Sequence, residues 1–259
     1  MNLQDLKWGS FGVVHFISLM CAVAMCVGIY FLLKNRSERT QTIVLFILSL
    51  FGMASVLYDF FYWGSTSSYL IYLPLHLCSY NQLLMPVLVL SKNRMLGNLL
   101  PLFAVGAGIA LIFNSIQADY AIFSWVFWLY YLSHTFGAAI PFLMYALKLV
   151  KPGTKYILPA VGITMLLYTV AHVFNLIIND YFIVNDIRDY LGEVYSVNYM
   201  FSIHPQGNPL LSFFYSIIPY PYFYMLMAVP IATAYFALIN IKEIIASIKS
   251  RIGKKKEAE

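Results

Sequence analysis

Charged residues and recognisable cofactor motifs are both scarce in this chain of 259 residues. Only 10% of the residues are Asp, Glu, Lys or Arg, against about 25% in soluble domains, which disfavours a soluble globular protein. There are three cysteines and no Cys-x-x-Cys pair, so we expect neither a disulfide framework nor a metal site. A P-loop, a dinucleotide-binding glycine pattern and a His-Glu-x-x-His motif are also absent, and the sequence predicts no cofactor.

Hydrophobic residues are abundant instead: they make up 61% of the chain and gather into seven long stretches. Each stretch approaches the roughly 20 helical residues that are needed to cross a hydrocarbon core of about 30 Å. The predicted spans are residues 11–33, 43–63, 69–90, 96–114, 120–147, 156–178 and 212–239. The predicted fold class is therefore all-α, a polytopic membrane protein with a single domain of seven transmembrane helices.

The positive charges alternate from one loop to the next. Fourteen of the sixteen Lys and Arg residues fall on one side of the predicted bundle, and six of them lie in a basic tail, residues 240–259. The positive-inside rule makes that side cytoplasmic, so we expect an N-out/C-in protein of the cell membrane with a cytoplasmic C-terminus. Because these loops and the tail account for the net charge of +5, we expect no nucleic-acid partner.

One predicted outer segment, residues 179–211, is far longer than the other loops. It holds four acidic residues against one Arg, several Tyr and Phe residues, and a run of turn formers at 204–209. Loops of this length are usually lids, binding loops or disordered, and the aromatic content favours an ordered lid packed on the mouth of the bundle. Pro219 and Pro221 are expected to break or kink the last span just beneath this outer lid loop.

Polar side chains inside the predicted spans carry the candidate chemistry, because such groups are costly in a membrane and usually functional. With the orientation above, they gather in the outer half of the membrane or near its midplane: Asp59, His76, Cys78, His134, His172 and Asn175. On one helix, Cys78 and Asn81 would share a face. His76 and Cys78 would point in different directions, unless Pro74 distorts the first turn.

Each of these groups also has a structural explanation. A membrane cysteine is most often a small apolar filler, the class to which we assign Cys21 and Cys26. Asp59 can simply pair with a histidine or accept a hydrogen bond from a tyrosine, and His172 and Asn175 belong to a polar stripe that can join two helices. Against this, a buried thiol near an imidazole is the minimum for nucleophilic catalysis, because the histidine can take the thiol proton and later return it.

The segment Leu73-Pro74-Leu75-His76-Leu77-Cys78 resembles the L-P-L-H-L-C signature of the YwaF-like integral membrane proteins. Ser133-His134, and Asn198-Tyr199-Met200 followed by Pro205 and Asn208-Pro209, extend the resemblance over nearly the whole chain. Eukaryotic relatives of that family look like phospholipid acyltransferases that move fatty acyl chains into ether phospholipids. The resemblance implies by position that Cys78 is the acyl-accepting nucleophile and His134 its base, and it places Tyr199 among the supporting residues.

The leading hypothesis is a lipid-modifying enzyme, an acyltransferase or transacylase that draws phospholipid from the outer leaflet, with membrane lipids as acyl donor and acceptor. Asn81 or Asn175 would donate hydrogen bonds to the oxyanion. The alternative is a non-enzymatic transporter or binder of a small solute or lipid in an outward-facing polar cavity, and a structural or sensory subunit is a third possibility. The inner ends of the spans are nearly free of charge, which favours the enzyme over a transporter. The expected cavity is lined by Cys78, His134 and His172, with Asp59 or His76 at its rim.

Overall fold

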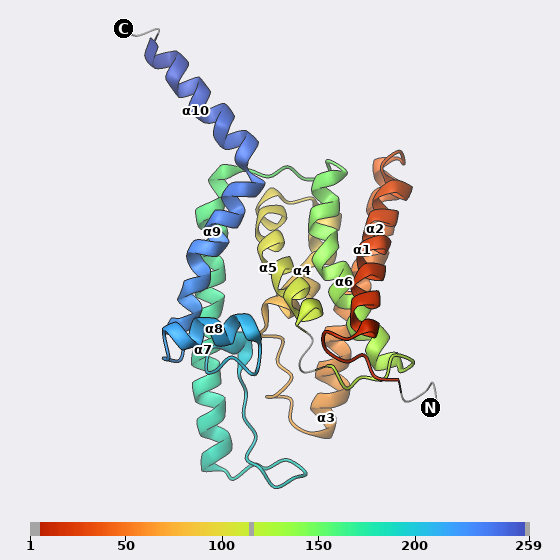
Figure 1. Cartoon of the computed structure of the whole chain (residues 1–259), viewed down its shortest axis with the longest axis vertical. Helices are drawn as coiled ribbons and strands as arrows, with labels where there is room; N and C mark the ends of the chain where they lie inside the picture. The colour runs from red at the N-terminus through yellow and green to blue at the C-terminus, as the bar shows by residue number, and fades with distance from the viewer. Residues whose placement is uncertain (1–5, 114–116, 257–259) are drawn as a thin grey trace.

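Helices make up the architecture of the described part of the chain. The computed structural model describes residues 6–113 and 117–256, and within these ranges it has no strand, only isolated bridges at Lys7–Ala121 and Arg188–Val194. The helices form an elongated bundle (Figure 1). The predicted all-α class is therefore confirmed. Asn114, the predicted end of the fourth span, and residues 257–259 of the tail lie outside the described residues.

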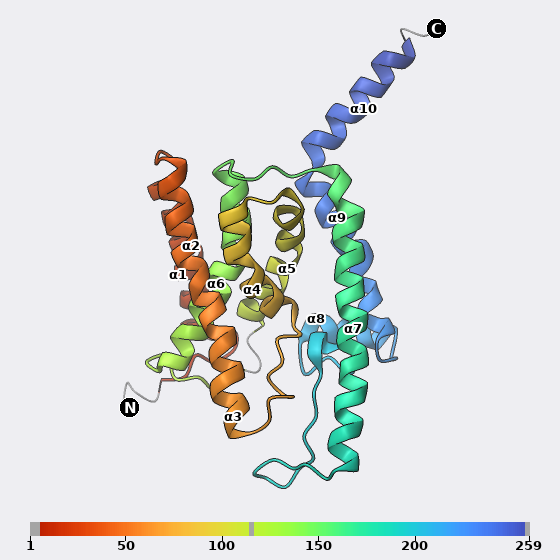
Figure 2. The ribbon, with the colours of Figure 1, turned by 180° about the vertical axis from the view of Figure 1, so that it is seen from behind.

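The described helices that run along the bundle alternate in direction from one to the next (Figures 1 and 2). In chain order they are α1 (Val13–Leu33), α2 (Glu38–Tyr58), α4 (Leu77–Ser91), α5 (Arg94–Ile112), α6 (Trp125–Ala146), α7 (Ile157–Val184) and α9 (Ala228–Ile239). The shorter elements are η2 (Asp59–Trp63), α3 (Gly64–Thr66), η3 (Thr154–Tyr156), η4 (Tyr199–Phe201), α8 (Pro209–Ile217) and η5 (Phe223–Met227). The last described helix is α10 (Ile241–Lys256).

Five helical segments of the described chain are long and apolar enough to cross a membrane. They are Val13–Leu33, Glu38–Thr66, Arg94–Ile112, Trp125–Ala146 and Thr154–Val184. Each corresponds to one predicted span. The other two predicted spans hold the shorter apolar helices Leu77–Ser91 and Phe223–Ile239. The described residues thus show five membrane-length helices where the sequence predicts seven spans.

The helix of the third predicted span starts later than its apolar stretch suggests. Residues 69–76 form turns and bends, and α4 begins only at Leu77. Pro74 explains the difference, because proline has no amide hydrogen to donate and pushes the preceding residue out of the helical region. His76 is the N-cap of α4, with extended backbone angles (φ −93°, ψ 152°). The predicted separation of His76 and Cys78 around one helix therefore does not apply.

The seventh predicted span is broken near its prolines. α8 ends at Ile217, and helical structure resumes at Phe223, after Pro219 and Pro221. Figure 1 shows that α8 lies across the bundle and not along it. Only residues 223–239 are left to run along the bundle, which explains why this apolar helix is short.

Helices α2, α4, α5 and α6 pack closely and form the centre of the bundle, with α1 against α6 on one side and α7 with α9 on the other (Figures 1 and 2). The central core includes the completely buried side chains of Leu45, Met85, Leu88, Leu100, Phe103, Ile140 and Met144. The outer helix α1 instead exposes its apolar residues: Val13 and Met20 are 75% and 71% exposed. An apolar outer surface of this kind suits contact with lipid.

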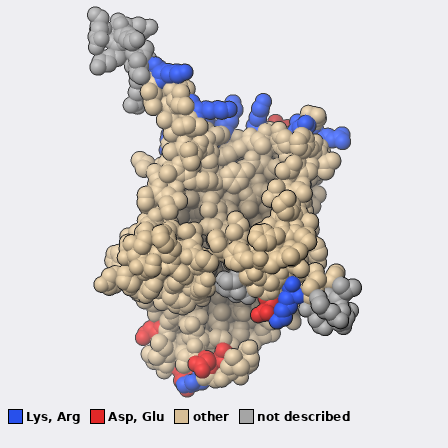
Figure 3. Space-filling view, viewed as in Figure 1, with Lys and Arg blue, Asp and Glu red and all other residues tan. Residues whose placement is uncertain are grey.

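The two ends of the bundle differ in charge. Figure 3 shows Lys and Arg side chains gathered mainly at the end where α10 leaves the bundle, and most Asp and Glu side chains toward the opposite end. The basic side chains come chiefly from the connections between α1 and α2, α4 and α5, and α6 and α7. We call these the basic end and the acidic end.

Candidate functional site

Cys78 lies in the first turn of α4, a position that the apolar pattern of the sequence did not indicate. The thiol is deeply buried there, beside the first backbone N–H groups of the helix. Within the described chain no side chain caps this end of α4, so its first N–H groups keep their capacity to donate, and the helix dipole adds partial positive charge. An oxyanion beside the sulfur would be stabilised by these N–H groups. Burial itself disfavours the thiolate, so Cys78 needs a base to take its proton.

His134 is buried in α6, and its contacts fix its tautomer. Nδ1 is 2.9 Å from the carbonyl oxygen of Tyr130 and 3.2 Å from Ser133 Oγ. Because a carbonyl oxygen can only accept a hydrogen bond, Nδ1 carries the proton and Nε2 keeps its lone pair. The Tyr130 ring stacks on the imidazole with centroids 4.0 Å apart, which holds the plane of the ring. His134 therefore has Nε2 ready to act as a base.

One hydrogen bond shows how α4 and α6 are aligned along the bundle axis. Asn81 Nδ2 donates to the carbonyl oxygen of Gly137 at 2.8 Å. The approach is close, since a Cβ at Gly137 would lie in van der Waals contact with Asn81 Nδ2, 3.4 Å away. Both helices end at the basic end and so run in the same direction (Figure 1). Cys78 comes three residues before Asn81, and His134 comes three residues before Gly137, which is roughly 4.5 Å along each helix. Cys78 and His134 therefore lie at the same height along the bundle, on two helices that touch.

Three further groups lie within electrostatic range of these two residues. Tyr130 and Asp59 are near enough to Cys78, and His76 is near enough to His134, for charge on one group to influence the other. Asp59 opens η2, a π-helical turn of a kind that is frequent at functional sites. Its side chain is exposed, and among the described residues its carboxylate has no ion pair and accepts no hydrogen bond. The pairing with a histidine or a tyrosine that the sequence allowed is therefore not seen.

His76 links the start of α4 to the predicted lid. Its Nδ1 accepts a hydrogen bond from the Met200 amide at 3.2 Å, so a neutral His76 carries its proton on Nε2. The ring centroids of Tyr199 and Phe201 lie 5.5 and 5.7 Å from that of the imidazole. The η4 turn of the lid therefore covers the residues that lead into α4.

Asn175 and Asn179 of α7 hold the same part of the lid by pairing with its backbone. Asn175 accepts from the Tyr199 N–H at 2.8 Å and donates to the Tyr199 carbonyl at 2.9 Å. Asn179 pairs in the same way with Val197, at 2.7 and 2.9 Å. From Asn175 to Asn179 the helix rises roughly 6 Å, and from Val197 to Tyr199 an extended chain spans roughly 6.6 Å. The two asparagines are therefore spaced to match the two backbone positions that they bind. We call residues 197–202 the clamped segment.

His172 belongs with the clamped segment. Its Nδ1 is 2.8 Å from Ser202 Oγ, and its ring centroid is 5.1 Å from that of Tyr222. Within the described residues, no hydrogen bond or ring contact joins His172 to Cys78 or His134. His172 is therefore not in direct contact with the other two, and the predicted cavity lined by all three residues stays a prediction.

Both amides that the sequence offered as oxyanion donors already donate a hydrogen bond elsewhere. Asn81 Nδ2 is bonded to a carbonyl of α6, and Asn175 Nδ2 is bonded to the clamped segment. The buried Gln82, by contrast, has a donor, Nε2, with no partner in the described residues. Gln82 is one turn after Cys78 on the same face of α4, and its Cγ lies close to Gly52 of α2 and Gly137 of α6. The i, i+4 spacing of Cys78 and Gln82 can be seen in the sequence. The hydrogen bond that engages Asn81 with α6 cannot, because it depends on how the helices pack.

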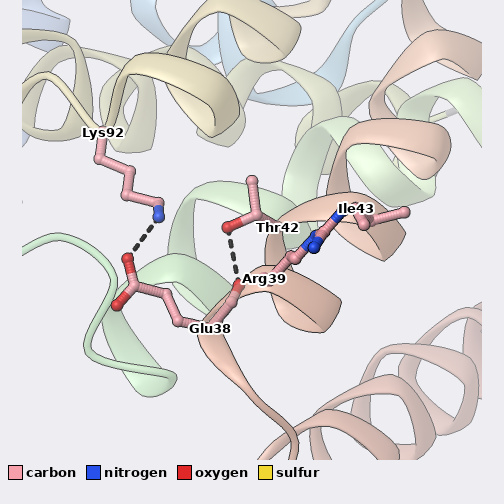
Figure 4. A pocket seen from close by; sticks show the side chains of 5 residues that line it. All are labelled: Glu38, Arg39, Thr42, Ile43 and Lys92. Carbon is pink, nitrogen blue, oxygen red and sulfur yellow. Dashed lines mark hydrogen bonds and ion pairs between the residues drawn. The ribbon is translucent and has the colours of Figure 1, made fainter.

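A surface pocket at the other end of α4 is separate from these residues. Figure 4 shows its lining, Glu38, Arg39, Thr42, Ile43 and Lys92, with Lys92 ion-paired to Glu38. Lys92 is the C-cap of α4, roughly 21 Å along the helix from Cys78. In the part of the chain that the structure describes, no three His, Cys, Asp or Glu side chains are grouped so that they could hold a metal ion.

The apolar helices and the buried polar residues between them define an all-helical membrane protein. The model of the TMEM164 family, a family of membrane proteins, matches residues 10–240, and the chain belongs to this family. The match covers Cys78, His134 and the clamped segment. No curated protein and no solved structure shows significant similarity to the chain.

Proposed function

We propose that this protein is a multi-pass, lipid-modifying enzyme of the cell membrane, a Cys/His-dependent acyltransferase or transacylase that takes phospholipid from the outer leaflet. The observation that carries the proposal is the placement of Cys78 and His134 one turn from the hydrogen bond that joins α4 and α6. The Nε2 lone pair of His134 and the position of Cys78 at the start of α4 support the same chemistry. The resemblance of residues 73–78 to the YwaF-like proteins is a separate argument for it.

The proposed reaction has two acyl-transfer steps. In the first, His134 Nε2 takes the thiol proton of Cys78 while the sulfur attacks the ester carbonyl of a phospholipid. The ester C–O bond breaks, the departing lysolipid oxygen takes the proton from His134, and the acyl chain remains on Cys78 as a thioester. In the second, the hydroxyl of an acceptor lipid gives its proton to His134 and attacks the thioester. A new ester forms, and the proton returns to the Cys78 sulfur.

The oxyanion of each step would be stabilised from α4 itself. The first N–H groups of this helix are uncapped, and Gln82 Nε2 has no partner within the described chain. Donors fixed in place before the reaction stabilise developing charge more effectively than water does. Asn81 and Asn175 would instead act as positioning residues, because their amide nitrogens already hold α6 and the clamped segment.

The proposal includes seven spans with the acidic end outside. α4 is too short to cross alone, but the turns of residues 69–76 continue its path and are covered by the clamped segment. Irregular backbone is tolerated at membrane depth where protein buries it. Residues 223–239 would form the seventh span, and α8 would lie on the protein at the outer side.

A topology experiment checks this orientation. A reporter fused after Lys249 should read cytoplasmic, and one inserted in the hairpin at residues 188–194 should read external, since fourteen of sixteen basic residues lie on the C-terminal side. A reporter in the connection between α4 and α5 is the matched internal control and should agree with the C-terminal one. An external C-terminus would place the site in the inner leaflet and overturn the proposed substrate source.

Lipid analysis tests the activity directly. Membranes of cells that express the protein should differ from membranes of cells without it in the acyl chains of one phospholipid class. Cells that express Cys78→Ala at the same level should match the cells without the protein. If Cys78→Ala produces the wild-type lipid profile, a thioester mechanism is excluded.

The second candidate function is a non-enzymatic transporter or binder of a small polar solute or lipid. The observation that favours it is the unpartnered donor of Gln82, because a buried donor is costly unless a ligand accepts its hydrogen bond. A binder would need Gln82 and would tolerate Cys78→Ala. Binding or transport that survives Cys78→Ala and is lost in Gln82→Leu would favour this function over the enzyme.

A further inference from the structure

α10 begins directly after the last helix of the bundle, at the basic end. α9 ends at Ile239, Asn240 is buried, and α10 follows from Ile241. In Figures 1 and 2 α10 leans away from the bundle, and no other helix lies beside its far half. α10 therefore projects obliquely beyond the basic end of the bundle, away from the other described helices.

One face of α10 is apolar and exposed. Ile241, Ile244, Ile245 and Ile248 follow the i, i+3, i+4, i+7 spacing that places residues on one side of a helix. Ile241, Ile245 and Ile248 are 45%, 46% and 52% exposed, so the described chain leaves much of this isoleucine stripe uncovered. A stripe of this kind is unfavourable in water and needs an apolar environment.

Glu243 shows which side of α10 faces the bundle. Its Oε2 accepts a hydrogen bond from the Thr154 amide, at the start of η3, at 3.0 Å. Glu243 is about 200° around the helix from Ile241, and so it points away from the isoleucine stripe. Because Glu243 is turned toward the bundle, the isoleucine stripe faces away from the bundle.

Basic residues border the stripe. Lys242 and Lys249 are exposed and seven residues apart, so both lie on the same flank of α10. The sequence continues with Arg251 and Lys254–Lys256. Glu243 is the one acidic residue between Ile241 and Lys256, and it is already hydrogen-bonded.

We infer that α10 is an interfacial helix that binds an anionic phospholipid surface at the basic end of the bundle. The isoleucine stripe enters the boundary between headgroups and acyl chains, and the flanking lysines contact the anionic headgroups. A second copy of the chain is a poorer partner, because stripe-to-stripe packing would bring lysine flanks of like charge together. The inference rests on α10 alone and holds whether or not Cys78 is catalytic.

The test uses the full-length chain with its three cysteines replaced by alanine and one new cysteine on α10. Ile245→Cys lies in the stripe, and the matched control Ala246→Cys is exposed on a neighbouring face. Each is labelled with a polarity-sensitive fluorophore in vesicles of phosphatidylcholine, with or without phosphatidylserine. The label at position 245 should shift to the blue and be quenched by quenchers carried on acyl chains, and the label at 246 much less. The shift should be larger with phosphatidylserine and fall to the phosphatidylcholine level in Lys242→Glu/Lys249→Glu.

Three results would overturn the inference. Equal emission from positions 245 and 246 would show that the stripe does not enter the lipid. Equal shifts with and without phosphatidylserine would remove the anionic surface as the partner. A blue shift in detergent that grows with protein concentration would identify a second copy as the partner.

Discussion

Cys78→Ala should abolish covalent labelling of the protein by an acyl-mimetic thiol probe, while Cys21→Ala and Cys26→Ala should leave labelling unchanged. Among the three cysteines, Cys78 lies at the uncapped start of a helix and at the level of an imidazole with a free Nε2. A desolvated thiol reacts as the thiolate and needs a base to take its proton. The measurement is mass spectrometry of the labelled protein, which identifies the modified cysteine.

His134→Gln should slow labelling of Cys78 by roughly 10²–10⁴-fold, the usual contribution of a general base. Glutamine is a suitable replacement because its amide can still donate to the Tyr130 carbonyl, which preserves the fold of α6. The matched control is His172→Gln, which changes an imidazole that contacts Ser202 and not the α4–α6 contact. If the two variants slow labelling equally, or if all three cysteines are labelled equally, Cys78 is a packing residue and not a nucleophile.

The sequence predicted most of the helices because a helix that faces lipid needs a long apolar run. The prediction of helices was wrong where the chain is apolar but prolines prevent a continuous helix. Residues 69–76 read as membrane-spanning by composition, yet Pro74 delays the helix until Leu77. Residues 212–239 read as one span, yet the chain breaks into α8 and a shorter helix around Pro219 and Pro221. Hydropathy alone does not distinguish a lipid-facing helix from an apolar turn that the protein buries.

The candidate site was predictable only as a set of residues. The depth of polar side chains in the predicted spans and the resemblance to the YwaF-like proteins identified Cys78 and His134. Neither could show that α4 and α6 meet at Asn81 and Gly137, since that depends on packing. For the same reason Asn175 was read as a donor to the oxyanion. Its amide is instead used by a backbone segment more than twenty residues later in the chain.

The clamped segment leads to the second large expected effect. Asn175→Ala would remove the partners of the Tyr199 N–H and carbonyl, both of which belong to a buried residue, and one partner of Ser202. Each buried backbone group left unpaired costs about 1–3 kcal/mol, so the free energy of unfolding should fall by about 2–4 kcal/mol. Thermal or denaturant unfolding in detergent micelles measures this loss.

Asn185→Ala is the matched control, because this asparagine is also on the α7 end but is exposed and donates only to the Tyr181 carbonyl. Its effect on unfolding should stay within about 0.5 kcal/mol. Hydrogen exchange then locates the change: in Asn175→Ala the Met200 amide, which donates to His76, should exchange faster, while amides in α5 keep their wild-type rates. If Asn175→Ala and Asn185→Ala destabilise equally, or if Met200 exchange is unchanged, Asn175 does not hold the lid. Faster exchange of the Met200 amide would mean that its hydrogen bond to His76, the N-cap of α4, has weakened. Asn175 would then hold the lid against the turn that positions Cys78.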